Sequence, residues 1–145
     1  MRFLDHPIHP MLVHFPIALW TIAAIAYVMG AVGIVESADR IAEFSNAAGL
    51  IAALLAMLAG ALELRAIDSQ SEAMRVATWH MMIMATVWFC FLAALMISIS
   101  AGLGRATSQL FAAACAIAGF LLMMIGGWFG GRLVYHFGVG VKHQG

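Results

Sequence analysis

The sequence predicts an all-α integral membrane protein, folded as one up-down four-helix bundle over residues 1–145. Hydrophobic residues make up 64% of the chain and charged residues only 10%, whereas soluble domains usually carry about a quarter charged residues. The charges also avoid four long stretches, which span residues 6–35, 44–62, 76–104 and 106–131. A soluble globular domain, a nucleic-acid binder and a disordered chain are therefore excluded.

Each uncharged stretch is close to the roughly 20 apolar residues that a membrane-spanning helix needs. We expect helices near residues 10–35, 44–64, 76–100 and 108–135. A transmembrane β-barrel would need alternating apolar and polar residues, which runs such as AAGLIAALLAMLAGAL do not show. The short connections favour an up-down-up-down order, in which the first and third helices are diagonal neighbours across the core. No internal repeat is evident.

The first helix carries a proline, Pro16, in its interior. Proline has no backbone N–H, so the carbonyl of Leu12 is expected to lose its helical partner. The chain before this helix has one basic and one acidic residue, and the apolar run is longer than that of a signal peptide. We therefore expect a spanning helix here and no cleaved signal.

Basic residues are distributed unevenly between the two ends of the expected bundle. Two lie at the end opposite the termini, namely Arg40 and Arg105. Five lie at the end that holds the termini: Arg2, Arg65, Arg75, Arg132 and Lys142. Because cytoplasmic flanks carry the excess of Lys and Arg, we expect both termini in the cytoplasm.

The histidines all belong to the membrane face at which the chain starts, as four crossings require: His6, His9, His14, His80, His136 and His143. His14 and His80 each lie about four residues inside their helices, on the order of 6 Å below the interface at about 1.5 Å per residue. An ionisable residue at that depth indicates a function. The histidines nearer the chain ends have a simple interfacial position as their ordinary alternative.

Two imidazoles that face each other at one depth can supply both axial ligands of haem b. His14 and His80 are the favoured pair, because their helices lie diagonally across the core. They are equally the favoured ligands of a bare metal ion. The sequence leaves open whether His9 or His136 replaces one of them.

Other polar residues at the same end are candidates for supporting roles. Glu63 ends the second helix and is either a proton carrier facing the histidines or an interfacial acid. Arg132 is a candidate partner for a haem propionate or for Glu63, and the alternative is that it extends to the interface. The methionines beside His80 could help to hold copper(I), although methionine more often fills gaps in a core. Gly126 and Gly130 form a spacing that lets helices approach closely.

The two end motifs, HPIHPMLVHFPIALW (residues 6–20) and GGWFGGRLVYHFGVGV (residues 126–141), resemble a known bacterial family. This is domain of unknown function 2231, a group of four-helix inner-membrane proteins, and the resemblance covers the whole chain. It implies a multi-pass protein of the bacterial inner (cytoplasmic) membrane, surrounded by lipids. It also matches an acid at Glu63 and a histidine at His80. Tyr135 and His136 are adjacent here, where the family pattern places a residue between them.

Members of the family that this chain resembles occur near or fused to redox domains such as Rieske or cytochrome modules. The resemblance therefore implies electron transfer, by association only. Three functions follow as hypotheses. The first is a haem b electron-transfer protein that serves a quinone or a redox protein partner. The second is a non-catalytic anchoring or accessory subunit of a larger redox complex, or a homo-oligomer. The third is the handling of copper, zinc or iron. Whether the protein is an enzyme stays open.

Overall fold

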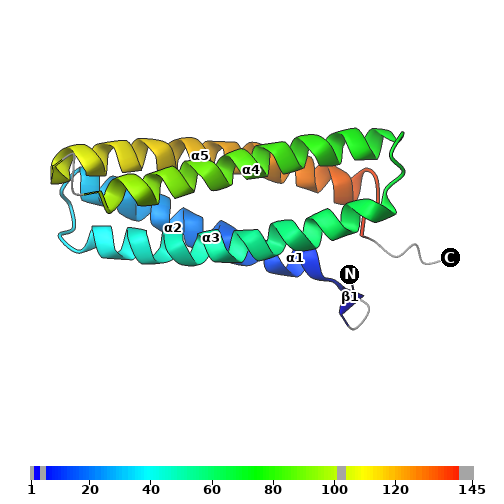
Figure 1. Cartoon of the computed structure of the whole chain (residues 1–145), viewed down its shortest axis with the longest axis horizontal. Helices are drawn as coiled ribbons and strands as arrows, with labels where there is room; N and C mark the ends of the chain where they lie inside the picture. The colour runs from blue at the N-terminus through cyan, green and yellow to red at the C-terminus, as the bar shows by residue number, and fades with distance from the viewer. Residues whose placement is uncertain (1, 4–5, 101–103, 141–145) are drawn as a thin grey trace.

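Four long helical segments run up and down in a bundle in the computed structural model, which describes residues 2–3, 6–100 and 104–140 (Figure 1). This all-α architecture confirms the predicted fold class. Each segment is long and apolar enough to cross a membrane: Ile8–Ala31, Ala38–Ala66, Glu72–Ser98 and Arg105–Tyr135. The protein is a multi-pass membrane protein.

The elements follow one another in a simple order. Two short antiparallel strands, β1 (Arg2–Phe3) and β2 (His6–Pro7), precede the bundle. The helices are α1 (Ile8–Leu12), α2 (His14–Ala31), α3 (Ala38–Glu63), the short 3₁₀ helix η1 (Leu64–Ala66), α4 (Glu72–Ser98) and α5 (Arg105–Tyr135). The described parts of both ends of the chain lie at the same end of the bundle as the α3–α4 connection (Figure 1). We call this the histidine end and the opposite one the far end.

The first membrane span is broken into α1 and α2 at Val13. Pro16 explains the break, because it cannot donate to the carbonyl of Leu12. The neighbouring bonds are kept: Val13 N–H donates to the carbonyl of His9 at 3.1 Å, and Ile17 N–H donates to the carbonyl of Val13 at 3.2 Å. The two helices therefore remain parts of one span, Ile8–Ala31.

The other helices start earlier than the charge pattern suggests. α3 begins at Ala38 rather than near residue 44, because charged residues are included in its first turns. α4 begins at Glu72 and is capped by Ser71, whose hydroxyl accepts the N–H of Met74 at 3.1 Å. Such a cap satisfies a backbone donor that the first helical turn leaves without a partner.

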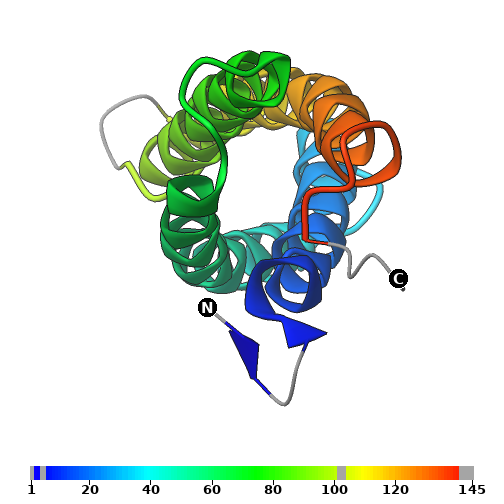
Figure 2. The same ribbon diagram turned by 90° about the vertical axis from the view of Figure 1, so that its right-hand side faces the viewer.

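The four spans form a ring in the order α2, α3, α4, α5, seen along the bundle axis in Figure 2. α2 and α4 are therefore diagonal to each other, as are α3 and α5. Trp20 of α2 and Phe91 of α4 reach across the diagonal, and both are fully buried. Their rings stack with centroids 4.6 Å apart and planes 2° from parallel. This stack fills the middle of the core.

The polar side chain of Asn46, on α3, is fully buried and contacts the residues of the aromatic stack. Its Nδ2 donates to the hydroxyl of Tyr27 at 3.1 Å and to the carbonyl of Phe91 at 2.8 Å. Asn46 thereby joins α3 to both α2 and α4. Its Oδ1 has no hydrogen-bond partner among the described residues.

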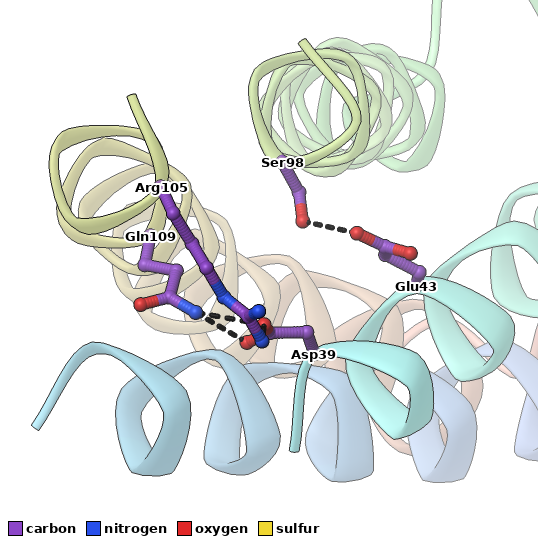
Figure 3. A network of polar contacts seen from close by, with 5 residues as sticks. All are labelled: Asp39, Glu43, Ser98, Arg105 and Gln109. Atoms are coloured by element: carbon purple, nitrogen blue, oxygen red, sulfur yellow. Dashed lines mark hydrogen bonds and ion pairs between the residues drawn. The ribbon is translucent and has the colours of Figure 1, made fainter. Parts of the chain in front are cut away.

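The far end is held by a polar network between three helices (Figure 3). Asp39 of α3 accepts a bond from Arg105 of α5 at 2.7 Å. Gln109 Nε2 donates to both carboxylate oxygens of Asp39, at 2.8 and 2.7 Å. Ser98 of α4 donates to Glu43 of α3 at 2.6 Å. Asp39 and Glu43 have partners inside the bundle, and this accounts for the early start of α3.

Candidate functional site

His80 lies in the first turns of α4 and is half-buried. Its Nδ1 lies 2.8 Å from the carbonyl oxygen of Gly126 on α5. A carbonyl only accepts hydrogen bonds, so Nδ1 must carry the proton and donate it. In the neutral ring, Nε2 then has a free lone pair. This is the state in which an imidazole binds a metal.

His9 lies in α1 and is held in the same way by α3. Its Nδ1 donates to the carbonyl of Ala56 at 2.7 Å. Its backbone N–H points to Glu63 Oε1 at 3.5 Å, so the carboxylate of Glu63 lies beside the helical turn that carries the ring. Within the described part of the chain, the Nε2 of this imidazole makes no hydrogen bond.

A glycine on the facing helix makes room for each imidazole. A Cβ atom added at Gly60 would lie 3.0 Å from Cε1 of His9, and one added at Gly130 would lie 3.1 Å from Cε1 of His80. Both distances are shorter than an ordinary van der Waals contact. The two rings can approach α3 and α5 this closely only because these positions lack a side chain.

The two imidazoles lie next to each other. Their ring centroids are 6.4 Å apart, and the ring planes are 85° from parallel. His9 belongs to the first span and His80 to the third, so the pair bridges the diagonal of the bundle. We call His9, His80 and the two glycines opposite them, Gly60 and Gly130, the histidine site.

The bundle closes over this end with a small apolar cluster. Val76, Ala77 and Leu133 are its buried members. They are joined by partly buried side chains from the α3–α4 connection, from α5 and from the end of the described chain: Leu64, Ile67, Phe129, Phe137 and Val139. The segment after α5 is held back by a hydrogen bond from Val139 N–H to the carbonyl of Leu133, at 2.9 Å. The main hydrophobic core lies on the far-end side of the histidines.

The expectation that His14 faces His80 across the core is wrong. His14 begins α2 and is exposed on the surface of the bundle, and His9 is the histidine that meets His80. The position of His14 in the chain gives its level along the bundle, but it does not fix the direction of the side chain around the helix.

The other predicted residues at this end have different neighbours. His136 is exposed, and its ring meets Phe137 edge-on with centroids 4.6 Å apart. Arg132 lies 3.8 Å from Glu72 and its guanidinium lies 5.3 Å from the centre of the Trp128 ring. Neither histidine of the site is among these contacts. His143 and the side chain of His6 lie outside the described part of the chain.

Four residues that hold or accommodate the imidazoles were not assigned this role from the sequence: Ala56, Gly60, Gly126 and Gly130. The carbonyls of Ala56 and Gly126 have no signal in the sequence, since every residue carries one. Gly60 stands in a run of Ala and Leu, where a glycine looks like ordinary helix packing. Gly126 and Gly130 are part of a noted motif, but the structure uses Gly130 to seat a ring. Across the residues described, no group of three or more His, Cys, Asp or Glu side chains is placed to hold a metal ion.

The family described as predicted membrane protein, domain of unknown function 2231, matches residues 5–143 of the chain. That span includes all four helical segments and the histidine site. No curated protein and no solved structure matches the chain.

Proposed function

This chain belongs to the domain of unknown function 2231 family of predicted membrane proteins, and we propose that it binds haem b through His9 and His80 and transfers electrons in the membrane. The observation that carries the proposal is the pair of adjacent imidazoles, each fixed through Nδ1 to a backbone carbonyl. Among the described residues, neither ring has a hydrogen bond at Nε2, and each Nε2 would serve as a ligand. Metal-binding histidines commonly donate their other ring nitrogen to a carbonyl in this manner.

The spacing of the rings supports two ligands on one metal. Imidazoles bonded to opposite sides of a metal ion, with metal–nitrogen bonds of about 2 Å, have ring centroids about 6 Å apart. The observed separation is 6.4 Å. Haem iron already has four porphyrin nitrogens and takes axial ligands from the protein, whereas a structural zinc ion takes four protein ligands. His9 and His80 would therefore be sufficient to hold a haem iron.

The haem would supply a one-electron iron couple, and the chain's own residues would set the conditions for it. The carbonyls of Ala56 and Gly126 hold the rings in one tautomer and increase their strength as ligands. The apolar cluster around Leu133 keeps water from the outer side of the site. Arg132, at the same end, is the candidate partner for a propionate, and Glu63 beside His9 is the candidate proton carrier.

The proposal extends to the location of the protein. Lys and Arg are in excess at the histidine end, which by the positive-inside rule faces the cytoplasm. With the bacterial family, this favours the inner membrane with both termini cytoplasmic. The electron donor or acceptor is then a quinone in the bilayer or a redox protein that reaches the cytoplasmic surface.

Optical spectra of the purified protein test the proposal. The protein is produced in haem-replete cells, purified in mild detergent, and analysed for porphyrin and metals. We expect a Soret band and about one haem per chain, lost in His9→Asn and His80→Asn but kept in His14→Asn. Asparagine suits this test because its side-chain amide can still donate to the carbonyl while lacking Nε2. A colourless protein without porphyrin would refute the proposal, and bound copper, zinc or iron without porphyrin would favour metal handling instead.

A place in a larger complex, or in a homo-oligomer, is a second candidate with its own observation. Gly127 is exposed on α5, and a Cβ added there would meet nothing within 4 Å. Gly131 follows one turn later on the same helix. Small residues on an outward helix face let another helix approach closely. Native mass measurement in mild detergent tests this, and a single chain free of partners would count against it.

A further inference from the structure

The two halves of the bundle carry the same features at equivalent positions. His9 and His80 are 71 positions apart in the chain, and the residues whose carbonyls they bind, Ala56 and Gly126, are 70 apart. The pair of hydrogen bonds therefore repeats from the hairpin of the first and second spans to that of the third and fourth. In both hairpins, a histidine near the start of the first helix docks near the end of the second.

The same relation holds in the middle of the bundle. Trp20 and Phe91 are 71 positions apart and stack on each other. A Cβ added at Gly49 would lie 2.7 Å from the ring of Trp20, and one added at Gly119 would lie 2.9 Å from the ring of Phe91. These glycines are 70 positions apart. In each half, an aromatic ring from the first helix lies against a glycine of the second.

Burial follows the same offsets at a series of core positions. In the first helix of each half, three pairs at an offset of 71 are buried in both copies: Pro16 and Val87, Trp20 and Phe91, Ala23 and Ala94. In the second helix, six pairs at an offset of 70 are buried in both: Ala38 and Ser108, Ala42 and Ala112, Asn46 and Ala116, Gly49 and Gly119, Ala53 and Met123, Ala56 and Gly126. The core-facing sides of the two hairpins therefore have one pattern.

The arrangement in space agrees with the pattern. α2 lies diagonally opposite α4, and α3 lies diagonally opposite α5 (Figure 2). A half-turn about the long axis of the bundle therefore exchanges the hairpins. We infer that the chain consists of two copies of one helix hairpin related by an approximate two-fold axis, and that the histidine site is one ligand site made of two equivalent halves on that axis.

In each half, the imidazole is held by a seat of two residues: one whose carbonyl accepts its hydrogen bond, and a glycine four positions later in the same helix. In an α-helix the residue at i+4 bonds to carbonyl i, and side chains lean towards the N-terminus. A side chain at i+4 would thus cover the carbonyl that the imidazole needs. Gly60 leaves the carbonyl of Ala56 open to His9, and Gly130 leaves that of Gly126 open to His80. Both glycines are positioning residues for the rings.

The equivalence also indicates the class of ligand. A group on the axis receives one imidazole from each hairpin, so it must offer the same chemistry on two opposite faces. A metal porphyrin does so, and this step rests on the function proposed above. The carbonyls and glycines that hold the rings belong to the chain itself, so their equivalence can be tested separately from haem binding.

Nitrogen NMR of the detergent-solubilised chain, labelled with ¹⁵N in the histidine rings, tests the seats without a ligand. In their neutral form, we expect the rings of His9 and His80 to show a protonated Nδ1 and an unprotonated Nε2. Gly60→Ala should shift the His9 ring towards the tautomer protonated at Nε2, and Gly130→Ala should do the same for His80. The control is Gly127→Ala, where the added Cβ meets nothing within 4 Å, and it should change neither ring.

Haem titration of the same variants completes the test. Gly60→Ala and Gly130→Ala should weaken haem binding by similar factors, within the 10- to 100-fold range of partners that support a metal ligand. If one seat responds in the NMR experiment and the other behaves like Gly127→Ala, the halves are not equivalent and the inference is refuted. If both seats respond alike but the wild type binds no haem, the inference stands and the proposed function fails.

Discussion

Removal of the Asn46 side chain tests how the middle of the bundle is held together. Asn46→Ala eliminates the bonds from Nδ2 to the Tyr27 hydroxyl, at 3.1 Å, and to the Phe91 carbonyl, at 2.8 Å. Hydrogen bonds between membrane helices contribute about 0.6 kcal/mol on average and at most about 1.7, so two of them contribute about 1–3 kcal/mol. The buried Oδ1 has no partner among the described residues. Its removal therefore offsets part of the loss, and we expect about 1–2 kcal/mol of destabilisation.

Reversible unfolding in mixed detergent micelles, followed by helical circular dichroism, measures this change. Thr21→Ala is the control, because the Thr21 hydroxyl bonds only to the carbonyl of Ile17 in its own helix, at 2.7 Å. It should alter the free energy of unfolding by less than about 0.5 kcal/mol. A double-mutant cycle with Tyr27→Phe should give a coupling energy near 0.6 kcal/mol. An Asn46→Ala variant as stable as Thr21→Ala, or a cycle without coupling, would refute the reasoning.

Two further substitutions probe the other contacts of the bundle. Gly49→Ala places a Cβ 2.7 Å from the fully buried Trp20 ring and should destabilise the protein by about 1–3 kcal/mol. Its control, Gly127→Ala, should be neutral or stabilising by up to about 1 kcal/mol. Equal free energies of unfolding for the two variants would contradict this expectation. At the far end, Asp39→Ala loses the hydrogen bonds to both Arg105 and Gln109 and should lower the free energy of unfolding by about 1–2 kcal/mol. Arg105→Ala should lower it by less than about 1 kcal/mol, because the Arg105 side chain is 75% exposed. The reverse order in the same unfolding assay would show that the ion pair dominates.

The helices were predictable because lipid imposes a simple rule on the sequence. A charge in the middle of a bilayer is costly, so long uncharged runs mark the spans. The rule fails at the ends of helices, where charges are tolerated if they are paired. Asp39 and Glu43 lie within α3, and each has a partner on another helix.

The sequence predicts at which end of the bundle the histidines lie, but not which histidines face each other. Four membrane crossings in sequence place the histidines at one end of the bundle, whatever the directions of their side chains. Which histidine meets His80 depends on the direction of each side chain around its helix, and the uncharged runs do not give that direction. Carbonyl partners such as Gly126 cannot be read from side-chain identities at all.

The internal repeat is not visible in the amino-acid sequence, for a physical reason. Lipid-facing positions accept almost any apolar side chain, so they diverge freely. Core positions between close helices require small residues, and Ala and Gly also occur throughout the rest of the chain. Only a few pairs with specific tasks keep their identity, such as His9 with His80 and Gly60 with Gly130. The repeat is visible only when contacts and burial are compared.

The spin state of the ferric protein tests the central claim most directly. Two axial imidazoles produce low-spin ferric haem, so electron paramagnetic resonance of the oxidised wild type should show a low-spin signal from about one haem per chain. His9→Asn and His80→Asn should each lose haem or convert it to high spin, whereas His14→Asn should keep the wild-type signal. A low-spin signal that survives in His9→Asn and disappears in His14→Asn would contradict the account.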